Sequence, residues 1–470
     1  MKLLLRIKSI IPFLFLIFFA YVVTSCIIPP LVHKSAGGEY QHTLTAKYFE
    51  SKTAGKERVQ CIDDNRDALL WRLRVIESAQ NEIILSTFDF KDDNSGRDIM
   101  ASLMNAANRG VQIKILIDGI NAHSLSHSKN FKSLVALPNV EVKLYNVINL
   151  IKPWKINYRM HDKYLIADDS VYILGGRNTN DRFLGAYTNK LTIDRDVLVY
   201  RPVPEETDSL TQLKNYFYAV WSLPCNKDFT YDKSPAWLSK TQYDLMKHYR
   251  TLRQDYPLAF QKTDWQAETI ETQNITLYTN PIEAENKVPE LWYALHQIML
   301  AGEDAVIQTP YIVCSRDMYN DLKTLCTAGK CVQIITNAVE SGANPFGCAD
   351  YMNQKKRILK TGVEVYEQVG DQSYHTKTIL IDDDVSIVGS YNLDMRSTYL
   401  DTEMMLVIKC PELNSTLSEQ ASILKDTSRR AYRDEKVSYG EQYEEIPFGL
   451  GKYFLYSLLR ILLSPIRHLI

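Results

Sequence analysis

The sequence predicts an α/β protein built from two similar halves, and three observations lead to that prediction. The chain has 470 residues, enough for two core-forming units of ordinary size. One pattern, H-x-K-x-x-x-x-D, occurs at residues 161–168 and again at 375–382. Stretches with helical and with strand-like periodicity alternate in the same order before each copy, which favours layered helices and strands.

The elements of the first half follow from the spacing of its apolar residues. Leu69, Leu73 and Ile76 recur at helical spacing, and a strand-like stretch follows at 82–88. Next we expect, in order, a helix at 97–109, strands at 111–118 and 141–145, motif strands at 163–167 and 171–174, and a core-packing helix at 213–221.

The second half is expected to repeat this order. Its elements are a helix at 291–300, a strand at 305–309, a helix at 316–327, a strand at 331–336, a helix at 350–360, a strand at 363–366, and motif strands at 377–381 and 385–388. We therefore place the first half at 45–221 and the second at 275–425. A helical linker or insertion of unassigned role lies between them at 222–274, and a tail follows at 426–470.

Each copy of the pattern supplies the residue types that chemistry at a phosphodiester needs. One histidine can attack phosphorus while another protonates the departing alcohol. Lysine and asparagine side chains can neutralise and hold the phosphoryl oxygens. The candidates are His161, Lys163, Asp168 and Asn178 in the first copy, and His375, Lys377, Asp382 and Asn392 in the second. Because these side chains carry the charge, we expect no metal and no other cofactor.

The two motif aspartates have two interpretations. Asp168 and Asp382 belong to the repeated pattern, so they are candidates for catalysis. Both also stand at a strand-to-turn junction, where aspartate is favoured for hydrogen bonds to nearby backbone.

The paired pattern resembles the HKD signature of the phospholipase D superfamily, from about Arg58 to Ile408. The extended motifs, H-D-K-Y-L-I-A-D-D-S-V-Y-I-L-G-G-R-N and S-Y-N-L-D-M-R-S-T-Y-L-D-T-E, are similar to those of bacterial cardiolipin synthases, most of all the C-type enzymes. This resemblance implies two phospholipase D-like α/β sandwich halves related by a pseudo-twofold axis. Both histidines would then meet in one cleft between the halves.

The resemblance also implies roles for particular residues. A phosphatidyltransferase would form cardiolipin from phosphatidylglycerol and a second phospholipid through a phosphohistidine, with His161 favoured as nucleophile and His375 as acid and base. The family places an acidic residue downstream of each motif to orient the histidines, and the candidates are Asp196 and Glu403. Arg177 and Arg396 would meet a second phosphate or lie on the surface. An accessory protein is a further partner, since some C-type relatives require one.

Other activities of the same superfamily are alternatives. With water as the acceptor, the site would be a phospholipase D hydrolase that releases phosphatidic acid. A nuclease is a second alternative, but the net charge of −2 and the pI near 6.5 lack the basic excess that gripping nucleic acid needs, so no nucleic acid partner is expected. A non-catalytic lipid-binding protein would not need every histidine, lysine and asparagine in duplicate.

The N-terminus predicts a targeting segment at residues 1–29. Lys2, Arg6 and Lys8 precede an apolar run at 10–23, which fits a signal sequence. The run ends in Val23-Thr24-Ser25-Cys26, which resembles a bacterial lipobox, so Cys26 is a candidate for lipidation. The alternative is an uncleaved membrane helix that reaches about Pro29. None of the eight cysteines forms a CxxC pair, so no zinc site is suggested.

The C-terminal segment at 448–470 is apolar, with a few basic residues and no acidic ones. This composition fits a helix that lies in an anionic lipid interface, and its alternative is a closing helix packed on the core. Together with the N-terminus, it predicts a protein anchored at the cell membrane by its N-terminal segment. The catalytic part would then lie on the extracytoplasmic side and act on phospholipid substrates.

Overall fold

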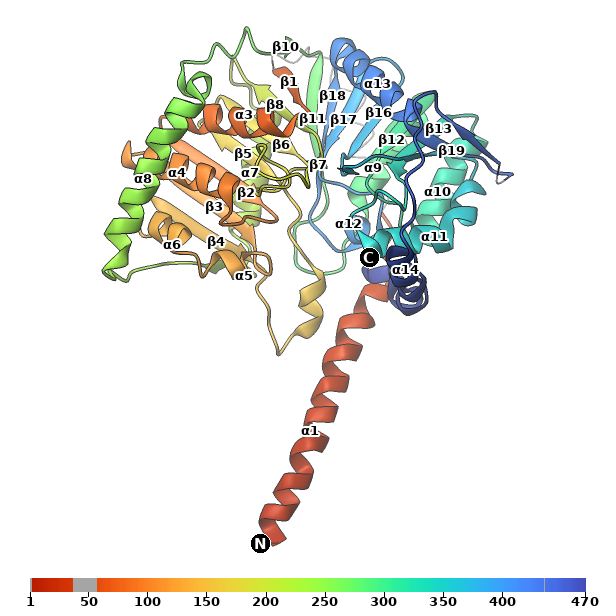
Figure 1. Cartoon of the computed structure of the whole chain (residues 1–470), viewed down its shortest axis with the longest axis horizontal. Coiled ribbons are helices and arrows are strands. Elements are labelled where there is room, and N and C mark those ends of the chain that lie inside the picture. Colours follow the sequence, from red (N-terminus) through yellow and green to blue (C-terminus); the bar gives the residue numbers. More distant parts are fainter. Residues whose placement is uncertain (1, 37–56, 435) are drawn as a thin grey trace.

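The computed structural model describes residues 2–36, 57–434 and 436–470, and its core consists of two nine-stranded sheets (Figure 1). The predicted start of the first half, residues 45–56, lies outside the described residues. Helices cover the outer faces of the sheets, and the sheets lie side by side with the ends of the motif strands between them (Figure 1). The predicted α/β class with two similar halves is confirmed.

The first sheet has the strand order β10-β1-β8-β6-β5-β2-β3-β4-β9. In chain order its strands are β1 (Arg58–Ile62), β2 (Glu82–Thr87), β3 (Gln112–Asp118), β4 (Val140–Tyr145), β5 (Tyr164–Ala167), β6 (Val171–Gly175), β8 (Asp196–Tyr200), β9 (Lys227–Asp228) and β10 (Ile270–Glu271). β2, β3 and β4 run parallel, whereas β5, β6 and β8 are antiparallel to their neighbours.

The second sheet has the order β11-β18-β17-β16-β12-β13-β14-β19-β20. Its strands are β11 (Asn274–Thr279), β12 (Asp304–Gln308), β13 (Cys331–Asn337), β14 (Glu364–Gln368), β16 (Thr378–Ile381), β17 (Val385–Gly389), β18 (Met404–Lys409), β19 (Ser428–Ala431) and β20 (Val437–Tyr439). β18-β17-β16-β12-β13-β14 repeats the order and directions of β8-β6-β5-β2-β3-β4. The internal repeat predicted from the sequence is therefore a repeat of topology.

Helices connect and cover the strands. They are α3 (Asn65–Ser78), α4 (Asn94–Asn108), α5 (Ala122–Leu125), α6 (Lys129–Val135), α7 (Ser209–Trp221), α8 (Trp237–Asp255), α9 (Glu290–Ala301), α10 (Arg316–Thr327), α11 (Pro345–Leu359), α12 (Met395–Tyr399) and α13 (Pro411–Asp426). α8 comes from the predicted insertion at 222–274, and it packs on α4 and α6 of the first half. The same segment supplies β9 and β10, so it completes the first half structurally.

Alternate side chains of the first sheet enter two different cores, because successive side chains of a strand point to opposite faces. Ile83 and Leu85 join the core beneath α3, α4 and α8. Ile84 and Leu116, from the opposite face, join the core that contains α7, α9 and the second sheet. The two halves thus share one apolar core, which fixes how they sit against each other.

The motif aspartates occupy the turns after β5 and β16. Asp168 and Asp382 have left-handed backbone, with φ of 53° and 49°. The carboxylate of Asp168 accepts hydrogen bonds from the backbone N–H groups of residues 80–82, and that of Asp382 from those of residues 303 and 304. Each lies five residues beyond its motif lysine, roughly 16 Å away along an extended strand. These contacts favour the structural interpretation of both aspartates over the catalytic one.

The two ends of the chain lie together against the body. α1 (Lys2–Ile27) projects from it, and the short helix η1 (Pro29–Leu31) follows. Next to them lie α14 (Leu450–Leu463) and η4 (Ser464–Leu469) (Figure 1). Nε2 of His468 lies 2.9 Å from the carbonyl oxygen of Ile27. Among the described residues, no helix has the length and apolar character needed to cross a membrane.

Candidate active site

Backbone pairing between the halves brings the two motif histidines, His161 and His375, to one place. The N–H of His161 donates to the carbonyl oxygen of Thr402 (3.3 Å), and that of His375 donates to the carbonyl oxygen of Ile193 (2.7 Å). The second contact continues the parallel pair of β7 (Thr192–Ile193) and β15 (Ser373–Tyr374). Each histidine is therefore docked on the opposite half, in a pseudo-symmetric arrangement.

Glu403 of the second half holds His161 of the first. Its Oε1 lies 2.8 Å from Nδ1 of the imidazole. The hydroxyls of Ser397 (2.6 Å) and Ser390 donate to the same carboxyl group. Burial raises the pKa of Glu403 to about 8, although the charge of Lys163 opposes the shift. The predicted orienting role of Glu403 matches this geometry, but the histidine it contacts belongs to the other motif.

Asp194 of the first half holds His375 of the second, with Nδ1 donating to Oδ2 over 2.6 Å. Burial alone would raise the pKa of Asp194, but the charges of Lys377 and His375 outweigh it and lower that pKa to about 2. The carboxylate is therefore ionised at neutral pH. An ionised acceptor fixes the proton on Nδ1 and leaves Nε2 as the reactive nitrogen.

The prediction that Asp196 orients a histidine is wrong. Its carboxylate lies 2.9 Å from the guanidinium of Arg72 and 3.4 Å from that of Arg177, all three fully buried or nearly so. Asp196 begins β8 inside the first sheet, whereas Asp194 directly follows β7, the strand that pairs with β15 of the second half. Two acids two residues apart look equivalent in the sequence, and the sheet boundary between them decides their roles.

The motif lysines, Lys163 and Lys377, are buried beside the histidines. Each ammonium donates to the carbonyl oxygen of the histidine in its own motif. Nζ of Lys377 also lies 3.2 Å from Nε2 of His375 and 3.8 Å from Asp194. Burial lowers the pKa of Lys163 to about 7 and that of Lys377 to about 8, with Glu403 and Asp194 respectively opposing the shift.

These charges act across the interface between the halves. Burial and the charge of Lys163 hold the pKa of His161 well below its ordinary value, and Lys377 adds to the effect. Burial and the charge of Lys377 lower the pKa of His375 to about 4, and Lys163 contributes as well. The motif histidines and lysines therefore form one electrostatic cluster. Both imidazoles are therefore neutral at pH 7, and each has one ring nitrogen without a proton.

Aromatic rings hold both imidazoles edge-on. The centroid of Phe88 lies 4.9 Å from that of His161, and the centroid of Phe183 lies 5.2 Å from that of His375. A ring packed on one side and a carboxylate on Nδ1 together leave each imidazole little freedom to rotate.

The two predicted phosphate-binding asparagines have hydrogen-bonding capacity to spare. Within the described part of the chain, Oδ1 of Asn178 and Oδ1 of Asn392 are buried without a hydrogen-bond partner. Nδ2 of Asn392 donates to the hydroxyl of Tyr311 (3.2 Å). These oxygens accept hydrogen bonds, so a phosphoryl oxygen would bind the amide N–H groups of the two side chains rather than Oδ1.

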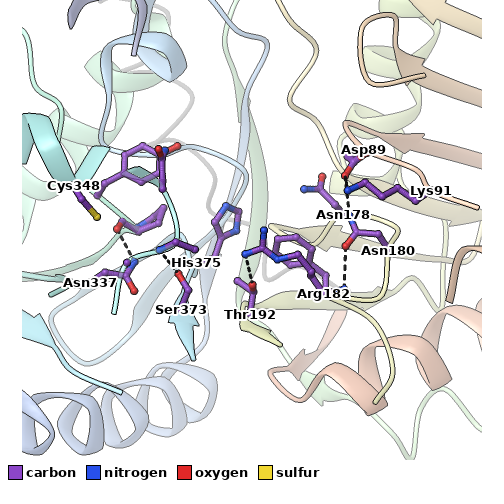
Figure 2. A pocket seen from close by; sticks show the side chains of 16 residues that line it. Asp89, Lys91, Asn178, Asn180, Arg182, Thr192, Asn337, Cys348, Ser373 and His375 are labelled. Atoms are coloured by element: carbon purple, nitrogen blue, oxygen red, sulfur yellow. Dashed lines mark hydrogen bonds and ion pairs between the residues drawn. The ribbon is translucent and has the colours of Figure 1, made fainter. Parts of the chain in front are cut away.

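A polar cavity of about 220 Å³ opens beside these groups, between the halves, and His375, Asn178 and Tyr311 line it (Figure 2).

Arg177 and Arg396 were expected to meet a second phosphate or to lie on the surface, and neither is placed for either role. Arg177 is buried against Asp196, and Arg396 is bonded to Asp401 (3.0 Å) and to the carbonyl oxygen of Asn157 (2.8 Å). Both brace the protein around the site.

Comparison with known proteins assigns the family. The family model described as "Cardiolipin synthase, PLD-like domain" matches residues 73–221 and 294–424, which is more than half of the chain. The chain belongs to this family. It is an enzyme of the phospholipase D superfamily, of the phosphatidyltransferase type.

Two curated relatives and one solved structure are similar to this cardiolipin synthase family member. Cardiolipin synthase C of Escherichia coli (strain K12) is 28% identical over 76% of this chain and 83% of its own length. Major cardiolipin synthase ClsA of Bacillus subtilis (strain 168) is 27% identical over 74% of this chain and 64% of its own. The crystal structure of phosphatidylserine synthase of Haemophilus influenzae Rd KW20 has the same fold, with a TM-score of 0.59 at 17% identity, over 90% of this chain and 100% of its own.

Replacing Asp194 and Asp196 separately should divide catalysis from stability. Asp194→Asn removes the ionised partner of His375 and should lower kcat by roughly 10²–10⁴-fold while the protein stays folded. Asp196→Asn leaves two buried guanidinium groups without their carboxylate and should cost about 3 kcal/mol or more of stability. Lipid turnover per folded molecule and urea unfolding measure the two effects. A kcat that falls with Asp196→Asn in fully folded protein, and not with Asp194→Asn, would contradict the assignment.

Removing the charge of Lys377 should raise the pKa of His375. A nearby positive charge disfavours the protonated ring, so Lys377→Met shifts the pKa upward from about 4, toward the ordinary value for histidine. Histidine ring resonances followed by NMR from pH 3 to pH 8 measure the shift, with His375→Gln identifying the signal. Lys262→Met, at an exposed site, serves as the control and should leave the pKa unchanged. An unchanged or lower pKa in Lys377→Met would show that the lysine charge does not reach this ring.

Proposed function

We propose that this protein forms cardiolipin by moving a phosphatidyl group from one phospholipid to the terminal hydroxyl of phosphatidylglycerol. The observation that carries the proposal is the cluster of two imidazoles, each held on Nδ1 by an acid of the opposite half, with the charges of both motif lysines acting on each ring. Two neutral histidines at one anion site suit a two-step displacement at phosphorus.

In the first step, Nε2 of His161 attacks the phosphorus of the donor phospholipid. A P–N bond forms, the P–O bond to the donor head group breaks, and His375 gives its proton to the departing oxygen. His161 suits the nucleophile because its pKa lies well below the ordinary value, so its lone pair is available. His375 suits the acid because Asp194 remains ionised and stabilises the imidazolium.

His375 must gain a proton before it can act as an acid. In the empty site, burial and the motif lysine charges hold its pKa near 4. A bound phosphodiester anion compensates those positive charges, so substrate binding raises this pKa and brings the proton into the site. Lys163, Lys377, Asn178 and Asn392 then hold the phosphoryl oxygens as charge builds on them.

In the second step, the hydroxyl of phosphatidylglycerol attacks the phosphohistidine. His375 takes the hydroxyl proton, the new P–O bond forms, and the P–N bond to His161 breaks. The product is cardiolipin, and the enzyme returns to its starting state. With water in place of the hydroxyl, the same step would release phosphatidic acid.

Labelled phosphatidylglycerol in vesicles tests the proposal. The wild-type protein should convert the label to cardiolipin, and either His161→Ala or His375→Ala should reduce the rate on the order of 10⁴-fold. After an alkaline quench during turnover, mass spectrometry should find the phosphatidyl adduct on the peptide that contains His161.

The outcomes separate the alternatives. Phosphatidic acid without cardiolipin would mean a hydrolase, and an adduct on His375 would reverse the order of the two histidines. Degradation of plasmid DNA that depends on His161 would favour the nuclease. Lys262→Ala should behave as wild type and controls for loss of protein during purification.

We further propose that the enzyme works at the surface of the cell membrane, on its extracytoplasmic side. Exposed apolar side chains occur in α1, in the loop before η2 (Pro153–Asn157) and in α14. These segments lie on one side of the molecule (Figure 1). The most exposed are Phe13 and Phe15 of α1, Leu150 and Ile151 of the loop, and Leu450, Phe454 and Ile461 of α14. We call the exposed residues of the loop and of α14 the docking face, and those of α1 extend it if the N-terminal helix is retained. Soluble proteins seldom expose an apolar surface of this kind unless it binds a partner or a membrane.

Contacts within this region support a single docking face. The hydroxyl of Tyr21 in α1 donates to the carbonyl oxygen of Ile151 (2.9 Å), and the thiol of Cys26 to that of Pro153 (3.4 Å). α14 packs its other side on α11, where Tyr456 is buried. The two interpretations of the C-terminal segment, a closing helix and a membrane-surface helix, therefore describe opposite sides of one helix.

Lipidation of Cys26 is the proposed anchor, with an uncleaved N-terminal helix as the alternative. Intact mass of the membrane-bound protein, measured for the wild type and for Cys26→Ser, distinguishes them. A lipoprotein lacks the residues before Cys26, whereas the variant, which can be neither lipidated nor cleaved there, keeps them and should be heavier. With an uncleaved helix as the anchor, the two masses should differ only by the substitution.

Polar substitutions in the docking face should weaken vesicle binding. Leu150→Ser with Ile151→Ser removes two exposed apolar side chains, and binding to vesicles that contain phosphatidylglycerol should fall at least about tenfold. Flotation of the purified protein measures it. Leu258→Ser with Ile423→Ser, at exposed sites elsewhere on the body, is the matched control. Equal losses in both pairs would remove the special role of this face.

A further inference from the structure

The cavity beside His375 contains more positive charge than one phosphodiester needs. Besides His375 and Asn178, its lining includes the exposed cations Lys91 and Arg182, both from the first half (Figure 2). One side of the cavity carries Asn337 and Ser373 of the second half (Figure 2). The other side carries Asp89, Lys91 and Asn178, and Arg182 lies between the two sides (Figure 2). The motif lysines are buried apart from these cations and contact the histidines.

The two cations have few partners within the described structure. Nζ of Lys91 lies 3.4 Å from the carboxylate of Asp89, and the side chain of Lys91 is half exposed. Among the described residues, the guanidinium of Arg182 makes one hydrogen bond, to the hydroxyl of Thr192 (3.2 Å), although an arginine has five N–H donors. The second-half amides are already used, since Asn337 bonds backbone groups on both sides and Asn344 caps α11.

One carboxylate connects these cations to the reacting groups. Asp89 contacts Lys91 and accepts a hydrogen bond from Nδ2 of Asn180 (2.9 Å). Burial raises the pKa of Asp89, and the charges of both Lys91 and Lys163 oppose that shift. The charges of Lys91 and of the motif lysine Lys163 therefore act on the same carboxyl group at the edge of the cavity.

The acceptor in the proposed reaction has a phosphate of its own. In phosphatidylglycerol, the hydroxyl that attacks is one glycerol unit away from a second phosphodiester. If the hydroxyl reaches the phosphohistidine, this second anion must lie close by, in a space that suits a polar head group rather than acyl chains. A lysine and an arginine, the latter able to bind in a bidentate manner, are the side chains that hold such an anion.

We propose that Lys91 and Arg182 form a second phosphate subsite, which binds the phosphate of the acceptor phospholipid and so directs transfer to phosphatidylglycerol rather than to water. This inference rests on the proposed transferase function. The same chemistry would bind a free glycerol phosphate, which provides a soluble probe.

Both side chains can be removed without disturbing the fold. The backbone of Lys91 donates to the carbonyl oxygen of Thr179, and that of Arg182 accepts from the N–H of Thr192 (2.9 Å); an alanine keeps both bonds. Lys91→Arg and Arg182→Lys keep the charge and serve as rescue variants. Lys262→Ala, which removes one exposed charge elsewhere, is the matched control.

The experiment compares two acceptors with one labelled donor phospholipid in vesicles. With phosphatidylglycerol as acceptor, Lys91→Ala and Arg182→Ala should each raise the acceptor KM about tenfold, because each loses a charged contact. Hydrolysis should also take a larger share of the product in this arm. With free glycerol as acceptor, which has no phosphate, transfer should stay within about twofold of wild type. The charge-keeping variants should recover most of the affinity.

Calorimetric binding of glycerol phosphate tests the subsite apart from the reaction. The wild type should bind it, and the double variant Lys91→Ala, Arg182→Ala should bind it at least about tenfold more weakly. Equal losses with both acceptors would overturn the proposal, because the cations would then act on a common step. Equal glycerol phosphate binding in wild type and double variant would overturn it as well. A wild type that makes no cardiolipin but shows this difference in binding would instead refute the transferase function and leave an anion subsite.

Discussion

The rest of the site depends on one interaction, in which an acid of each half holds the motif histidine of the other half. Glu403 reaches across to His161, and Asp194 reaches across to His375. Neither half alone contains a histidine with its Nδ1 held. The shared apolar core and the β7–β15 pair set the register that makes both contacts. Association of the halves is therefore part of building the reactive groups, since a ring free to rotate presents neither nitrogen reliably.

Burial gives the site its second property, a charge state that depends on the ligand. Burial lowers the pKa of Lys163 to about 7 and that of Lys377 to about 8, and it raises the pKa of Glu403 to about 8. Asp194, with its pKa near 2, is the group whose ionisation is secure. An arriving phosphodiester anion favours the charged lysines and a protonated imidazole. The shifted pKa values thus avoid part of the cost of burying several like charges. A bound substrate anion would balance the charges of the lysines and the imidazolium.

The segment that carries Glu403 is also connected to the ends of the chain. Arg396 bonds Asp401, and it donates to the carbonyl oxygens of Asn157 in η2 and Leu469 in η4. The carboxylate of Asp401 in turn accepts from the backbone N–H of Arg159, two residues before His161. Side chains next to the proposed docking face therefore brace the strand that positions a reactive imidazole. A membrane surface and a phosphoryl site would be joined here by rigid contacts rather than by a long linker.

The sequence by itself determined the repeated elements and the identity of the reactive side chains. Apolar periodicity placed a helix at 316–327, and α10 has those bounds, because a helix or strand is specified by which of its faces is apolar. The duplicated pattern identified the histidines, lysines and asparagines for the same local reason. Only the tertiary structure decided between Asp194 and Asp196, assigned each acid to the opposite histidine, and turned the segment at 222–274 into part of the first half. Those choices depend on where a sheet ends and how two halves dock, and no short stretch of sequence contains the register of an interface between distant segments.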